Sequence, residues 1–241
     1  MTASLTEAST ALHRQWDRLR AWVVEVVDDA VGDAPSVLEG WTVTELVAHV
    51  GRAMDALAAC SPVPAGTVPL TLGEYLGTYA DRAADIAQTT RQLAEQVADD
   101  PIAWIDDRAA AAFAALDAYS ADGDLVVQAR RGPVRLSAMT VSRVIELVVH
   151  ADDLYASVRR VPGAGAGPDP VDPLALDLVA SELLAVVVAR GGWDLEVTDA
   201  RTWVRLAAGR TPYDVDVLAG AVAARFTGDS VPDLGRMLPV L

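Results

Sequence analysis

Two of the three histidines in this chain stand inside apolar runs, each four residues after a glutamate. His49 follows Glu45 in the stretch ELVAHVGRAMD, and His150 follows Glu146 in the stretch VIELVVHADD. On a helix, residues four apart lie on the same face. Titratable side chains in such apolar surroundings need a partner, because burying them unpaired costs free energy. The pattern therefore indicates polar groups that line a buried or cleft-facing surface.

Imidazole and carboxylate groups are typical ligands of divalent metals. If the helices that carry them pack as a bundle, His49, Glu146 and His150 would meet between those helices. Two histidines and one glutamate with an open fourth position form a known catalytic zinc arrangement, and imidazole also suits nickel or iron. Asp153 follows His150 by three residues, where it would accept a hydrogen bond from an imidazole and orient it. One interpretation of the pattern is therefore a metal site, with zinc as the expected ion.

The same residues allow a purely structural interpretation. A histidine on an apolar face is commonly a core residue that is hydrogen bonded to the backbone. Glu146 also has an ion-pair partner of its own, Arg143, which lies one helical turn before it. The E-x-x-x-H spacing is far less specific than the H-E-x-x-H motif of zinc proteases. The spacing alone leaves both interpretations open.

The other reactive side chains fit structural roles better. His13 lies beside Arg14 in the first turns of an amphipathic helix, which predicts a surface position. A catalytic thiol needs an electropositive setting, and the only basic residue near Cys60 in the sequence is Arg52, two turns back, so a structural role is expected. Arginines also cluster on a predicted hairpin, where they are either solvated or bind a carboxylate. They are Arg130, Arg131 and Arg135.

The composition excludes several classes of function. The 241 residues carry a formal net charge of −15, and all 19 basic residues are arginines. This balance argues against nucleic acid and anionic membranes as partners, because both attract basic patches. A single cysteine rules out an internal disulfide. The sequence shows neither a signal peptide nor an apolar run of the ~18 residues that span a bilayer. We expect a cytoplasmic protein.

The elements that must position these residues are mostly helices. Thr42 and Glu45 form a capping box at the start of the helix that carries His49. A short alternating pattern broken by Arg-Gly-Pro favours a small hairpin or an extended loop over 122–137. The helix that carries His150 is predicted to start near Thr140 or Ser142. Apolar residues recur at helical spacing over 4–29, 42–59, 71–99, 102–119 and 138–158.

A second region follows a stretch rich in Gly, Pro and Ala. This stretch, at 162–172, predicts a linker. Beyond it, strands are predicted over 193–197 and 221–229, and helices over 174–192, 200–210, 212–220 and 232–241. The predicted fold class is α+β, with a helical bundle at 1–161 and a small mixed α/β domain at 173–241.

Two segments taken together form a more specific pattern. GWTVTELVAHVGRAMD and, a hundred residues later, SRVIELVVHADDLYAS resemble the mycothiol-dependent maleylpyruvate isomerase family, part of the wider DinB-like group of metal-binding four-helix bundles. The tail resembles the C-terminal half of a sterol-carrier-protein-like domain, through an Asp-x-x-Thr-Trp start, a Leu-x-x-Gly-Arg turn and a strand that ends in Gly-Asp. The residues that carry the first resemblance are Trp41, Thr42, His49, Glu146, His150 and Asp153.

The resemblance implies an enzyme that uses a metal and a thiol. In the family, two histidines and a glutamate, here His49, Glu146 and His150, hold a divalent metal that activates the thiol of mycothiol. In the isomerase, that thiolate adds to a cis double bond, allows rotation and leaves. An arginine of the C-terminal domain completes the pocket in relatives. Arg225 is the first candidate for it here and Arg210 the second. The implied partner is a small electrophilic substrate, and the chain would act as a monomer or homodimer.

Isomerase and thiol-transferase chemistry both remain open on this basis. A different function is also consistent with the sequence: a non-catalytic protein in which a metal-braced bundle binds a small apolar ligand or a partner. Fold alone does not decide between them.

Overall fold

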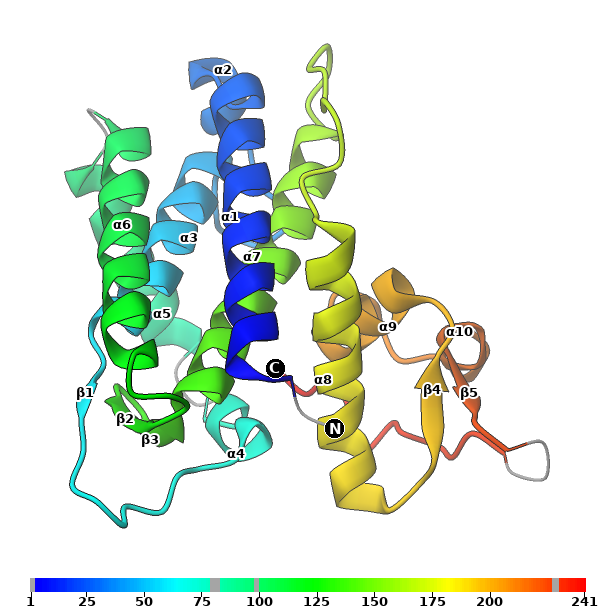
Figure 1. The fold of residues 1–241 in the computed structure, drawn as a ribbon. Coiled ribbons are helices and arrows are strands. Elements are labelled where there is room, and N and C mark those ends of the chain that lie inside the picture. Colours follow the sequence, from blue (N-terminus) through cyan, green and yellow to red (C-terminus); the bar gives the residue numbers. More distant parts are fainter. Residues whose placement is uncertain (1–2, 79–82, 98–99, 227–229) are drawn as a thin grey trace.

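The computed structural model of the protein describes residues 3–78, 83–97, 100–226 and 230–241. The fold is α+β, with helices in the majority and two small antiparallel sheets (Figure 1). The helices are α1 (Leu5–Val26), α2 (Asp29–Gly32), α3 (Val43–Ala58), α4 (Leu72–Leu76), α5 (Ala83–Gln96), α6 (Pro101–Ser120), α7 (Leu136–Val158), α8 (Pro173–Gly191), α9 (Ala200–Ala207) and α10 (Val215–Ala221). The strands are β1 (Ser61–Pro62), β2 (Val126–Ala129), β3 (Gly132–Arg135), β4 (Leu195–Val197) and β5 (Val222–Ala224).

Four long helices, α1, α3, α6 and α7, pack into a bundle (Figure 1). The closest pairing is between α3 and α6, and Gly51 permits it. A Cβ at this position would lie 2.3 Å from the ring of Trp104 on α6, so a side chain there would displace either that ring or the helices. In this way a glycine two residues after His49 sets how deeply α3 sits in the bundle.

The two helices that carry the predicted ligands begin at well-defined caps. Thr42 and Glu45 form the predicted capping box of α3, with the Thr42 amide donating to Glu45 Oε2 over 2.7 Å. Helix α7 begins at Leu136, earlier than predicted. Its cap is supplied from outside the helix, because Asp124 accepts hydrogen bonds from the Ser137 amide and hydroxyl. Helix α7 contacts α1, α3 and α8, and this central position explains why it is apolar on most sides.

The predicted hairpin of 122–137 is confirmed. Strands β2 and β3 pair antiparallel, Ala129 lies opposite Gly132, and the two arginines between them form the turn. Strand β1 adds to the other edge of β2 through Pro62 and Val127. This three-stranded sheet lies at the end of the bundle where α7 starts (Figure 1).

The C-terminal elements pack against the bundle through α8. This helix contacts α1 and α7 on one side and α9 on the other, and β4 pairs antiparallel with β5 (Figure 1). Trp203 on α9 is fully buried, and its indole Nε1 donates to the carbonyl of Ala180 on α8 over 3.0 Å. That large side chain anchors α9 to α8 and thereby fixes the loop that follows α9.

The segment 162–172, predicted as a linker, runs along α1 and is hydrogen bonded to it. Trp22 Nε1 donates to the Ala166 carbonyl over 2.7 Å, and Arg18 Nε donates to the Asp169 carbonyl over 2.7 Å. Gln15, fully buried, donates to the Pro170 carbonyl. The division into two domains at this segment stays a prediction.

Several element boundaries differ from the prediction. The first helix ends at Val26, because Asp28 caps the separate helix α2. The predicted single helix over 71–99 contains α4, which ends at Leu76, and α5; residues 79–82 and 98–99 lie outside the described part of the chain.

The end of the chain was also predicted incorrectly. Residues 232–241 form no helix, because Val240 donates its amide to the carbonyl of Ala207 on α9 instead of to a carbonyl within its own segment. The predicted strand over 221–229 is shorter and ends at Ala224, and its predicted end at 227–229 lies outside the described residues.

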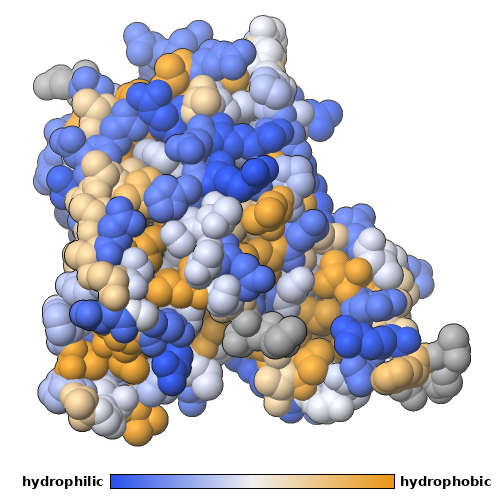
Figure 2. Space-filling model, viewed as in Figure 1, coloured by the Kyte–Doolittle hydropathy of each residue, from blue (hydrophilic) through white to orange (hydrophobic). Residues whose placement is uncertain are grey.

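Polar residues cover much of the visible surface, with small apolar groups between them (Figure 2). Among the described residues, no helix combines the length and the apolarity that crossing a bilayer requires.

Candidate metal centre

The structure brings His49, Glu146 and His150 together. One potential ligand atom from each of the three residues lies within 4.8 Å of the others. Glu146 Oε2 is 3.6 Å from His49 Nε2 and 3.3 Å from His150 Nε2. The three side chains are between 9 % and 14 % exposed, so they form one cluster that is largely shielded from solvent. Helix α3 supplies one imidazole, and α7 supplies the other two groups.

Each imidazole has a partner on its other nitrogen. His150 Nδ1 lies 3.0 Å from Asp153 Oδ2, and His49 Nδ1 lies 3.3 Å from the hydroxyl of Thr90 on α5. A partner of this kind fixes the tautomer and orientation of a ligating histidine. With Nδ1 engaged, Nε2 is the nitrogen of each ring that lies near Glu146.

The charge states suit a cation as well. Burial by itself would raise the pKa of Glu146, but contacts with His150 and His49 and the charge of Arg143 hold this pKa well below its usual range. Burial lowers the pKa of His49, which favours neutral imidazole. Burial also opposes the protonation of His150, but its hydrogen bonds to Asp153 and Glu146 raise its pKa overall. The site therefore combines a carboxylate with imidazoles, one of which is held neutral.

The spacing of Glu146 Oε2 from the two imidazole nitrogens fits a tetrahedral ion. Two ligands at about 2.1 Å from such an ion are separated by roughly 3.4 Å. The two distances from Glu146 Oε2 to the imidazole nitrogens, 3.6 and 3.3 Å, are close to this value. The residues present thus fit a divalent metal held by two nitrogens and one oxygen. Three protein ligands would leave one position of the tetrahedron open, as in catalytic zinc sites.

Asp153 connects this cluster to the C-terminal elements. Its carboxylate accepts hydrogen bonds from Arg210 Nε and Nη2 while it contacts His150. Burial would raise the pKa of Asp153, but these contacts lower it overall. Of the two arginines considered from the sequence, Arg210 reaches the cluster. Arg225 follows β5, is 57 % exposed, and lies 3.9 Å from Asp194.

Two further residues lie beside the cluster, and the first of them, Thr90, was not identified from the sequence. Thr90 contacts both His49 and Arg52, whose Nη1 donates to its hydroxyl over 3.4 Å. Arg143 is buried, donates to the Ala53 carbonyl of α3, and lies 4.0 Å from Glu146 Oε1, so the ion pair considered from the sequence is present beside the cluster. No local pattern marks Thr90, because its helix is separate from the two that carry the ligands.

The remaining candidates lie apart from these contacts. His13 is half-buried instead of fully on the surface, because its ring stacks on Phe113 of α6 at 4.0 Å. Cys60 is buried, and burial raises the pKa of its thiol to about 11. In the arginine cluster of the hairpin, Arg130 pairs with Asp55 and Arg131 lies over the ring of Tyr75.

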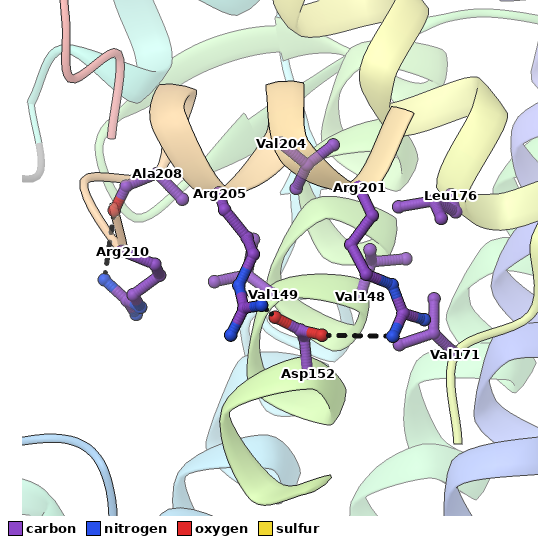
Figure 3. A pocket seen from close by; sticks show the side chains of 10 residues that line it. All are labelled: Val148, Val149, Asp152, Val171, Leu176, Arg201, Val204, Arg205, Ala208 and Arg210. Atoms are coloured by element: carbon purple, nitrogen blue, oxygen red, sulfur yellow. Dashed lines mark hydrogen bonds and ion pairs between the residues drawn. The ribbon is translucent and has the colours of Figure 1, made fainter. Parts of the chain in front are cut away.

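A crevice lies between α7 and α9, and Asp152 of α7 and Arg210 are among the residues that line it (Figure 3). Valines 148 and 149 form part of its apolar wall. Asp152 lies between two arginines of α9, with Arg201 Nη1 at 3.5 Å and Arg205 Nε at 3.0 Å (Figure 3). Arg210 lines the same crevice farther along. The crevice is therefore the contact surface at which the C-terminal elements meet the helix that carries Glu146 and His150.

Comparison with known proteins identifies the family. A model of the mycothiol maleylpyruvate isomerase N-terminal domain matches residues 12–155, which is more than half of the chain. The chain belongs to this family. The matched residues contain all of the three clustered ligands, whereas Arg210 and the rest of the C-terminal elements lie beyond them. The predicted likeness of the C-terminal elements to sterol-carrier proteins stays a prediction.

The fold of the whole chain agrees with solved structures from the mycothiol maleylpyruvate isomerase family. A crystal structure of the mycothiol-dependent maleylpyruvate isomerase is similar with a TM-score of 0.56 and 21 % identity. The structure of a histidine-to-alanine mutant of a mycothiol-dependent maleylpyruvate isomerase is similar with a TM-score of 0.59 and 20 % identity. Both similarities cover 97 % of this chain and 98 % of the other. No match to this sequence was found among curated proteins.

Proposed function

We propose that this protein is a metal-dependent enzyme that uses a low-molecular-weight thiol, mycothiol, to act on a small electrophile. The reaction is of the maleylpyruvate isomerase or thiol-transferase type. The observation that carries the proposal is the convergence of two imidazole Nε2 atoms on one carboxylate oxygen, within a cluster contributed by helices a hundred residues apart in the sequence. Membership in the family supports the thiol and the class of reaction.

The thiol must come from outside the chain. Cys60 is the sole cysteine, it is buried, and its pKa of about 11 leaves almost no thiolate at neutral pH. Its thiol also donates to the carbonyl of Ala56, in the last turn of α3, over 3.6 Å. An enzyme of this sequence that depends on thiolate chemistry therefore needs a small-molecule thiol.

The bound divalent metal would act as a Lewis acid that lowers the pKa of a coordinated thiol, so that the thiolate is present at neutral pH. His49, Glu146 and His150 would hold the metal. Asp153 keeps a proton on His150 Nδ1 and so leaves Nε2 as the ligating atom. Thr90 is placed to do the same for His49. The low exposure of all three ligands excludes bulk water from the side of the protein and strengthens the electrostatic interactions within the site.

In the isomerase type of reaction, the thiolate would add to a carbon–carbon double bond, the resulting single bond would rotate, and the thiolate would leave again. No net oxidation occurs, and the thiol is regenerated. In the transferase type, the thiolate displaces a leaving group or opens a strained ring and stays in the product. The two types differ in whether mycothiol is consumed.

Two measurements on the purified protein test the proposal. Elemental analysis should find about one divalent ion per chain, the stoichiometry expected of a site with three protein ligands. Turnover of maleylpyruvate and of model electrophiles should then require mycothiol and should be lost in His49→Ala. Metal binding without any thiol-dependent turnover would contradict the enzymatic proposal and favour a binding protein. Absence of bound metal, even after the protein is incubated with zinc, nickel or iron, would contradict the metal site itself.

A further inference from the structure

The carboxylate of Asp153 is hydrogen bonded to two partners, Arg210 and His150. Arg210 donates from Nε to Oδ1 over 2.9 Å and from Nη2 to Oδ2 over 2.9 Å, the two-pronged geometry that arginine provides. The same Oδ2 lies 3.0 Å from His150 Nδ1. Asp153 is only 3 % exposed, so little water competes for these bonds. The rotation of this carboxylate is therefore fixed by Arg210, and the carboxylate in turn faces the imidazole of His150.

The backbone after α9 holds Arg210 in place. Gly209 has a φ of +67°, its amide donates to the Leu206 carbonyl, and the Arg210 amide donates to the Arg205 carbonyl. These two bonds make the Schellman motif, which needs a left-handed residue at the position of the glycine. The guanidinium is also tied to its own loop, because Nη1 donates to the Ala208 carbonyl over 3.1 Å. The Leu-x-x-Gly-Arg turn thus orients the side chain of Arg210 toward α7.

We infer that Arg210 is a positioning residue for the candidate metal centre, acting on His150 through Asp153. The C-terminal elements thereby complete the hydrogen-bonded surroundings of a ligand that lies in the bundle. The part of this inference that concerns metal affinity rests on the proposed function; the part that concerns the orientation of His150 does not.

The chain offers a matched control one residue away. Asp152 precedes Asp153 on α7 and pairs with Arg205 Nε over 3.0 Å, so this pair also joins α7 to α9 (Figure 3). The two carboxylates differ in their other contacts. The Asp152 carboxylate contacts two arginines of α9, whereas the Asp153 carboxylate contacts His150. Arg205→Ala and Arg210→Ala therefore each remove one arginine that pairs with an aspartate of α7. Only Arg210→Ala removes a contact of Asp153, the residue that contacts the predicted metal ligand His150.

The first readout is metal affinity, measured by competition with a chelator for Zn²⁺. Arg210→Ala should weaken binding by about tenfold or more, the range seen when outer partners of ligating histidines are removed. Arg205→Ala should stay within about twofold of the wild type, because no metal ligand depends on it. Arg210→Lys keeps the positive charge but not the bidentate hydrogen bonding to Asp153. Its affinity for Zn²⁺ should fall between those of the wild type and Arg210→Ala. Thermal unfolding of each metal-free variant shows whether it is folded.

The second readout needs no metal. In the metal-free protein, the Nδ1 proton of His150 should give a slowly exchanging NMR signal in the wild type and in Arg205→Ala. In Arg210→Ala this proton should exchange faster, because Asp153 is free to rotate. If the wild type binds no metal but the signal still depends on Arg210, the proposed function fails and the positioning role stands.

Two results would overturn the inference. One is an unchanged His150 signal and an unchanged metal affinity in folded Arg210→Ala. The other is an Arg210→Lys variant equal to the wild type in both readouts, because that would mean that a nearby positive charge suffices and the grip on Asp153 has no role.

Discussion

The imidazole rings of His49 and His150 lie 4.7 Å apart between centroids and meet at 86°. This nearly perpendicular arrangement lets both Nε2 atoms approach the same oxygen of Glu146 without the rings colliding. The rings come from different helices, so their relation depends on how α3 packs against α7. A centre of this kind exists only in the folded bundle.

Removal of either ring should abolish metal binding. We expect His49→Ala and His150→Ala to bind less than about a tenth of the metal bound by the wild type, because two remaining ligands hold a divalent ion poorly. The third histidine provides the control: His13 stacks on Phe113 and contacts the Ser9 carbonyl, so His13→Ala should retain full stoichiometry. Elemental analysis after desalting is the measurement. Equal metal loss in all three variants would show that the ion binds elsewhere or not at all.

The thiol of Cys60 should be inert. Because burial raises its pKa to about 11, we expect no reaction with a thiol-specific reagent in the native protein at neutral pH, and one thiol per chain after unfolding in urea. Cys60→Ala should retain metal binding and any mycothiol-dependent turnover. Loss of turnover in a folded, metal-loaded Cys60→Ala protein would argue against an external thiol as the nucleophile.

The packing of α3 against α6 should tolerate no side chain at Gly51. A methyl there would approach the Trp104 ring to 2.3 Å, so Gly51→Ala should reduce the free energy of unfolding by about 1–3 kcal/mol, as overpacking does. Gly220 on α10 is the matched control, because a Cβ there meets nothing within 4 Å. Gly220→Ala should leave stability unchanged or raise it by up to about 1 kcal/mol. Urea unfolding of both variants measures these changes in stability. Equal effects of the two substitutions would contradict the close approach of α3 and α6 at Gly51.

Asp172 should make stability depend on pH. It caps α8 and pairs with Arg14 at 3.0 Å. Burial would raise its pKa, but the hydrogen bond from Arg14 and those from the Ala175 and Leu174 amides lower the pKa overall. A carboxyl whose folded pKa lies below its unfolded pKa stabilises the protein above the unfolded value, near pH 4, and loses this contribution as the pH falls through the folded pKa.

The variant that isolates this charge is Asp172→Asn, because asparagine still caps a helix. At pH 7 it should be less stable than the wild type by about 0.5–1 kcal/mol, a small value because Arg14 is half-exposed. The difference should shrink as the pH falls below about 4. The exposed Asp177 of the same helix gives the control, with Asp177→Asn expected to show neither effect. A difference that grows toward acid pH would contradict the assigned sign.

The sequence predicts those parts of the structure that local patterns control. The capping box of Thr42 and Glu45 and the hairpin formed by β2 and β3 depend on neighbours in the chain, and they are where the pattern placed them. The strands β4 and β5 fall inside their predicted ranges but are shorter. The start of α7 was missed because its cap, Asp124, arrives from thirteen residues away along the hairpin.

In the candidate site, too, the residues that share one helix could be predicted from the sequence, and those brought in by other elements could not. The spacing of Glu146 and His150 marks one face of a helix, and Asp153 falls on it by the same rule. Thr90 could not be found, because nothing near it in the sequence shows that α5 crosses α3 at His49. The choice between Arg210 and Arg225 also could not be made from sequence, since it depends on the Schellman turn after α9 and on where β5 ends.

The stretch at 162–172 has the composition of a flexible tether, yet the carbonyls of Ala166, Asp169 and Pro170 accept hydrogen bonds from side chains of α1. Two domains joined by a flexible linker tumble at separate rates. A linker that is hydrogen bonded to one domain restricts the motion of the other relative to it. In solution, amide relaxation should therefore report a single rotational correlation time for both halves of the chain.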